Sequence, residues 1–204
     1  MHRDEVEGSL AEDAPPALPE PVDKSEVQRP EGGAGPLFHR RYRTSIRDSR
    51  ISAHDLIERL CADPDVVAPS EFASFQKVRG ETGAMEVGDE YVVRMPGPWD
   101  GPVRVVHRTP NSFRFATLEG HLEAGQIEFR ALNDDASLEF EIESWARSAD
   151  RFADLLYDRF RMSKEIQLHL WTSMLERIAK LSEGRMTGGI EIHTRKIPTA
   201  ALGG

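Results

Sequence analysis

The feature that most constrains the fold is a series of alternating apolar and polar residues that gives way to a helical period. Between residues 102 and 145 apolar side chains occupy every second position of several segments, as in Ile127, Phe129 and Ala131. This period is typical of strands with one buried and one wet face. From about residue 150 to 181 apolar residues recur at steps of three and four, which predicts an amphipathic helix.

The remaining elements follow from the same reading. The predicted strands cover residues 39–48, 72–79, 89–95, 102–108, 112–118, 126–132 and 137–145. Ser52 is placed to cap a short helix that ends at Asp63-Pro64. The long helix carries Phe152, Leu156, Phe160, Gln167, Leu170, Met174, Ile178 and Leu181, and a break is expected near residues 161–163. The predicted class is α+β: a curved antiparallel sheet of about six to seven strands that grips a long C-terminal helix.

Composition sets the domain limits. Residues 1–36 hold six of the 13 prolines, nine acids and three basic residues, without an aromatic residue or an apolar period. Such a segment buries too little surface to offset its ordering entropy, so we expect a disordered acidic tail over 1–36. Glycines punctuate residues 184–204, which predicts a flexible tail with a short strand at 190–192. The folded domain is then expected over 37–183.

One segment carries a family resemblance. Residues 114–130 contain a Gly-His-x-Glu-x-Gly loop, here Gly120, His121, Glu123 and Gly125, followed by a strand with the inward aromatic Phe129. This segment resembles the signature of the domain-of-unknown-function family numbered nineteen-ninety. Ser144-Trp145-Ala-Arg147 and the helix with Gln167 and Trp171 are similar too. The resemblance implies the helix-grip fold of the START and birch-pollen-allergen-like (SRPBCC) superfamily, and it implies no settled activity.

The loop at Gly120–Gly125 is the most informative segment for chemistry. His121 and Glu123 are two residues apart and point the same way if the backbone is extended. One interpretation places them at the mouth of a cavity, where the carboxylate tunes the histidine for acid/base work. The other makes them ties between the loop and nearby backbone groups. Two residues are fewer than a metal site needs, so no metal is expected.

Polar residues on apolar faces leave similar alternatives. Gln167 lies on the stripe of the long helix, where it is placed to bond a ligand, a strand carbonyl or a buried water. His107 is expected on the inner face of its strand, as a ligand contact or as a satisfied core residue. The aromatic and thioether side chains expected to line an apolar cavity are Phe113, Phe115, Phe129, Phe140, Trp171 and Met174.

Several function classes are excluded or disfavoured. The net charge of -9 argues against nucleic acid, although the basic run Arg40–Arg50 weakens that argument. No apolar run approaches 18 residues, which predicts no membrane span and a cytoplasmic location. Nucleophile, P-loop and dinucleotide motifs are lacking, so no cofactor is expected. The single cysteine, Cys61, is expected to be a buried, inert thiol.

Three functional hypotheses remain. The first is a module that binds a small hydrophobic ligand, lipid or polyketide-like, through His107, Phe115, Gly120, His121, Glu123, Phe129, Gln167 and Trp171. The second is an enzyme of hydrolase, cyclase or isomerase type, with His121 as general acid or base and Glu123 as its orienter. The third is an interaction protein with a filled core, whose protein partners the sequence does not identify.

Overall fold

The computed structural model describes residues 1–20, 22–95, 100–134, 136–150 and 162–202, with the backbone alone for 162–166. Its strands are β1 (His2–Glu7), β2 (Ala34–Arg47), β3 (Ser74–Arg79), β4 (Glu90–Arg94), β5 (Asp100–Thr109), β6 (Ser112–Thr117), β7 (Glu123–Asp134), β8 (Ser137–Ser148) and β9 (Arg185–Ile197). The α-helices are α1 (Leu10–Asp13), α2 (Ala53–Ala62) and α4 (Met162–Leu181). Short 3-10 turns lie at Pro30–Gly32, Pro64–Val66 and Thr199–Leu202.

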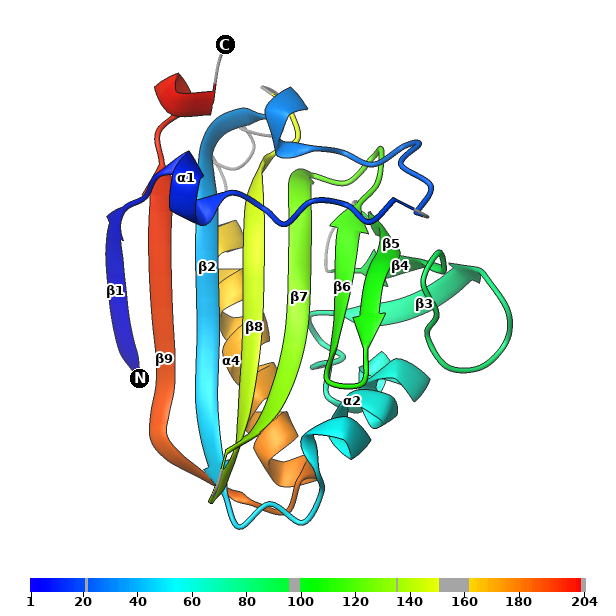
Figure 1. Ribbon diagram of the computed structural model, residues 1–204, viewed down its shortest axis with the longest axis vertical. Coiled ribbons are helices and arrows are strands. Elements are labelled where there is room, and N and C mark those ends of the chain that lie inside the picture. The colour runs from blue at the N-terminus through cyan, green and yellow to red at the C-terminus, as the bar shows by residue number, and fades with distance from the viewer. Residues whose placement is uncertain (21, 96–99, 135, 151–161, 203–204) are drawn as a thin grey trace.

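One curved sheet organises the described part of the chain. Its nine strands lie in the order β1-β9-β2-β8-β7-β6-β5-β4-β3 (Figure 1). The seven strands from β2 to β3 in this order pair antiparallel throughout, as the alternation predicts. The helix α4 lies behind the sheet in the view of Figure 1, against what we call the inner face. The predicted α+β helix-grip fold is thereby confirmed.

The inner face is buried by α4 and α2 together. Leu170, Met174 and Ile178 recur along α4 and are almost fully buried, in agreement with the predicted stripe. Ser52 caps α2, because its hydroxyl oxygen accepts a hydrogen bond from the backbone N–H of Asp55 at 3.1 Å. Residues 151–161, which the prediction assigned to the first part of the long helix, lie outside the described residues.

Both terminal segments have more structure than the sequence predicted. Residues 184–204 were expected to be flexible, but β9 runs over Arg185–Ile197 and pairs with β2. Ile190, Ile192 and Thr194 alternate into the interior, and Gly188 and Gly189 provide the positive φ angles of the register shift between the two strands. The glycines therefore shape a strand instead of a tail.

The acidic N-terminal segment is likewise part of the fold. The strand β1 pairs in parallel with β9, and the described residues between Asp13 and Gln28, here called the strap, cross the outer face of the sheet (Figure 1). Val22 packs there against Val106 and Ala116. The prediction of disorder was wrong because it counted periodic apolar residues, whereas this segment is held by few apolar contacts and many polar ones.

Candidate functional site

The Gly-His-x-Glu-x-Gly loop joins β6 to β7 at one end of the grip. Gly120 has a φ of +95°, which an L side chain rarely adopts, and it allows the tight turn in which the His121 N–H donates to the Leu118 carbonyl at 3.0 Å. Glu123 then begins β7. The loop thus presents His121 and Glu123 at the start of a strand whose inner face meets α4.

The His121 ring is held by the main chain. The backbone N–H of Glu123 donates to His121 Nδ1 at 2.9 Å, so the neutral ring carries its hydrogen on Nε2. The ring lies against Gly101 of β5, where a Cβ atom would stand 2.9 Å from Nε2. Burial lowers the pKa of His121, which keeps the ring neutral at pH 7.

The second ring nitrogen of His121, Nε2, is available for a further contact. Among the residues that the structure describes, Nε2 has no hydrogen-bond partner. The ring is half-buried and stands above Gly101, whose cross-strand partner is Val93. A donor N–H at a partly open, mainly apolar position is suited to an acceptor atom of a bound molecule.

A side-chain hydrogen bond connects the loop to the long helix. Gln167 Nε2 of α4 donates to Glu123 Oε1 of β7 at 2.8 Å. Of the alternatives that the sequence left for Gln167, the structure therefore shows a bond to a strand residue, through its side chain and not its carbonyl. Tyr42 of β2 is buried nearby. Its burial raises the pKa of the phenol, and the positive charge of Arg40 offsets this only in part, while the negative charge of Glu123 adds to it.

Partly buried apolar side chains lie on the neighbouring strands and on α4, packed against the main core. Phe75 and Val93 lie on β3 and β4, Ile127 lies on β7, and Trp171 lies one turn beyond Gln167 on α4. The Trp171 ring meets the Phe129 ring edge to face, with centroids 5.8 Å apart. An apolar wall with a few polar groups at one end results.

Deeper in the grip the aromatic residues are packed together. Phe113, Phe115 and Phe129 are each at most 3% exposed. The space that they enclose with Leu60, Pro64, Val67, Phe75 and Met174 measures about 10 Å³, which accommodates no more than a single water. Phe115 and Phe129 therefore form core at this depth, whereas Trp171 stays partly exposed above them.

His107 lies on the other side of the sheet from its predicted position. A β-bulge shifts the register of β5 between Val105 and His107. The bulge places His107 opposite Arg114, whose side chain points to the outer face beneath the strap, while Val105 remains in the inner core. An added residue in a strand reverses the alternation beyond it, and no residue pattern in β5 indicates the bulge.

Three positions of the site were missed by the sequence reading. Gly101 makes room for the His121 ring, Tyr42 lies near Glu123, and Gln28 contacts the loop backbone. A glycine inside a strand was the available signal for the first of these. No group of three metal-binding side chains occurs among the described residues, and none of the described helices is long and apolar enough to cross a membrane.

Most of the chain matches a known protein family. The family model described as Domain of unknown function (DUF1990) matches residues 30–176, which includes the loop, the sheet from β2 to β8 and most of α4. The chain belongs to this family. The match leaves β1, the whole strap and β9 outside its limits. No curated protein matches the sequence.

Solved structures agree on the fold of this DUF1990 member. Norcoclaurine synthase from Thalictrum flavum, in complex with a transition-state analogue, is 11% identical with a TM-score of 0.52 over 74% of this chain and 96% of that chain. The same enzyme in complex with dopamine and hydroxybenzaldehyde gives 11% and 0.50 over 78% and 93%. A major latex-like protein from Panax ginseng gives 14% and 0.49 over 71% and 97%. The two norcoclaurine synthase structures share the helix-grip architecture of this chain.

Proposed function

We propose that this protein binds a small, mainly apolar molecule, lipid or polyketide-like, that carries a hydrogen-bond acceptor such as a carbonyl oxygen. The ligand lies at the end of the grip, between the start of β7 and the described N-terminal half of α4. The observation that carries the proposal is His121 Nε2–H, a donor without a partner among the described residues, beside a partly buried apolar wall. His121 donates to the acceptor, and the wall takes the apolar body.

Glu123 and Gln167 frame the site in this proposal. Their hydrogen bond joins β7 to α4 and fixes the distance between this strand and this helix. The ligand contacts Ile127 and Trp171 above the packed aromatic core. Phe115 and Phe129 belong to that core and support the site from below without contacting the ligand. Gly120 contributes the turn. The norcoclaurine synthase complexes support the proposal only in showing that this fold accommodates small molecules.

The geometry favours binding over acid/base catalysis. The His121 nitrogen that accepts a proton in the neutral ring, Nδ1, already accepts the Glu123 backbone N–H. Glu123 Oε1 accepts from Gln167, so the ring is oriented by the main chain and not by this oxygen. His121 is arranged to donate a hydrogen bond and not to abstract a proton.

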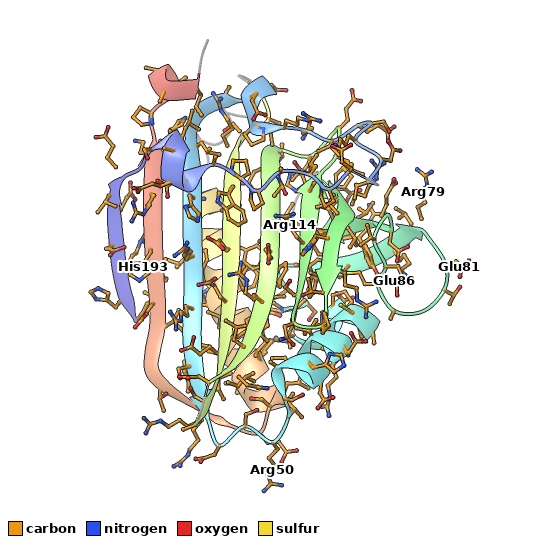
Figure 2. The ribbon with its side chains drawn as sticks, viewed as in Figure 1. Arg50, Arg79, Glu81, Glu86, Arg114 and His193 are labelled. Atoms are coloured by element: carbon orange, nitrogen blue, oxygen red, sulfur yellow. The ribbon has the colours of Figure 1, made fainter. Side chains whose placement is uncertain are left out.

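The experiment is a titration with prodan, an apolar naphthalene dye whose carbonyl makes its emission sensitive to hydrogen bonding. We expect saturable binding to the wild-type protein and about tenfold weaker binding to His121→Ala, for the loss of one hydrogen bond. 2-Dimethylaminonaphthalene lacks the carbonyl, and its affinity should not change with this substitution. The control His193→Ala alters an exposed histidine of β9, labelled in Figure 2, that contacts Asp4 of β1 at 2.9 Å.

The outcomes separate the hypotheses. Equal affinity of His121→Ala and His193→Ala for prodan would show that His121 does not recognise the acceptor. If His121→Ala loses its native circular dichroism, the histidine is a structural tie of the loop, and the proposed role is withdrawn. If the wild type shows no saturable prodan binding, the result favours the third hypothesis, an interaction protein with a filled core.

A further inference from the structure

The strap connects the outer face of the sheet to the loop on the inner face. Figure 2 shows Arg114 on the face across which the strap runs, and its Nη2 reaches the Ala17 carbonyl at 3.5 Å. Gln126 Nε2 donates to the Pro16 carbonyl at 2.8 Å. Arg104 Nη1 donates to the carbonyls of Asp23 and Ser25 at 2.9 and 2.8 Å. These buried side chains fix the path of the strap along its length.

The last residues of the strap pair with the chain leading into the loop. The Gln28 backbone N–H donates to the Thr117 carbonyl at 2.9 Å, and the Glu119 N–H donates to the Glu26 carbonyl at 2.7 Å. Val27 and Leu118 form an antiparallel bridge between these two bonds. The strap therefore extends the ladder at the end of β6 by a few residues, directly before His121.

The Gln28 side chain then reaches across the loop. Its Nε2 donates to the His121 carbonyl at 2.8 Å and to the Glu123 carbonyl at 3.0 Å. A primary amide has two hydrogens, and these two bonds use both. The two carbonyls lie on either side of the peptide N–H that holds His121 Nδ1. Gln28 thereby fixes the backbone on both sides of the bond that orients the ring.

We propose that Gln28 is a positioning residue for His121, and that the strap brings to the loop a donor which the sheet itself does not supply. The inference rests on the proposed function, in which His121 donates to the ligand. Gln28 lies before residue 30, where the family match begins, so the role is assigned by geometry alone. Without this amide the two carbonyls lose their donor, and the ring samples more than one orientation.

The test uses two substitutions that remove the donors and retain the length of the side chain. Gln28→Glu replaces the amide by a group that only accepts, and Gln28→Met replaces it by a neutral, apolar one. Gln76→Glu is the matched control, because it adds the same charge at an exposed position of β3, far in sequence from the loop. The readouts are the ring ¹⁵N signals of His121 by NMR, prodan affinity, and urea unfolding.

In the wild type and Gln76→Glu we expect His121 to show one Nε2–H tautomer. In both Gln28 variants we expect averaged ring signals, and about tenfold weaker prodan binding, with unfolding still cooperative. Unchanged ring signals would overturn the positioning role. Altered ring signals with unchanged affinity would overturn its importance for binding. If the wild type binds no prodan, the proposed function fails, while the ring signals still decide whether Gln28 orients His121.

Discussion

Replacement of Glu143 by Gln should destabilise the protein far more than the same replacement of Glu139, which lies four residues earlier on β8. Glu143 is 5% exposed on the outer face. Its Oε1 contacts His39 Nε2 at 2.7 Å and accepts from Arg41 Nε at 2.8 Å. The other His39 nitrogen contacts Asp13 Oδ1 at 2.8 Å, so the ring satisfies both carboxylates only when both nitrogens carry hydrogen.

The magnitude follows from the pKa of Glu143. Burial alone would raise this pKa, but the hydrogen bonds from His39 and Arg41 outweigh it and bring the pKa from 4.5 to about 2. Since one pKa unit corresponds to about 1.4 kcal/mol, the ionised carboxylate contributes on the order of 3 kcal/mol. A depressed pKa gives stability that is fully present above pH 4.5 and is lost as pH falls toward about 2.

The assay is urea unfolding of the wild type, Glu143→Gln and Glu139→Gln, followed by circular dichroism between pH 7 and pH 3. Glu139 pairs with the exposed Arg43 on the same face, so its replacement should cost less than about 1 kcal/mol. The gap between wild type and Glu143→Gln should be about 3 kcal/mol at pH 7 and should narrow in acid. Equal costs at pH 7, or a gap independent of pH, would refute this reasoning.

Other perturbations probe the site and the core. Gly101→Val should displace the His121 ring, which lies 2.9 Å from the added Cβ, and weaken prodan binding measured by fluorescence without abolishing folding. Cys61 is buried and burial raises its pKa to about 11, so it should react with a thiol reagent at pH 8 only after unfolding; rapid reaction of the native protein would contradict this. Phe115→Ala should cost about 3–5 kcal/mol in urea unfolding, because the packed core leaves a cavity there; a cost below 1 kcal/mol would argue for an open interior.

The sequence specified the parts of the fold that depend on periodicity. Alternation located the antiparallel strands because one face of each is buried, and the change of period located the helix that ends at Leu181. His107 escaped the same reasoning, since a bulge changes which face a residue occupies without changing its neighbours in the sequence.

The candidate site was predictable only in part. Glu123 and Gln167 were singled out by their polarity in apolar surroundings, and the structure joins them at 2.8 Å. Gln28 could not be found in this way, because its partners are backbone carbonyls more than ninety residues away in the chain. Contacts from a side chain to the backbone leave no pattern in the partner's sequence, so a segment that depends on them resembles a disordered tail.

Native mass spectrometry of the protein purified from its native source tests the central claim most directly. The account predicts that the wild-type chain carries a small molecule, seen as a discrete excess of mass that is removed by organic solvent, and that His121→Ala expressed in the same cells carries less of it. A wild-type chain that shows its sequence mass alone, under conditions that keep it folded, would contradict the account.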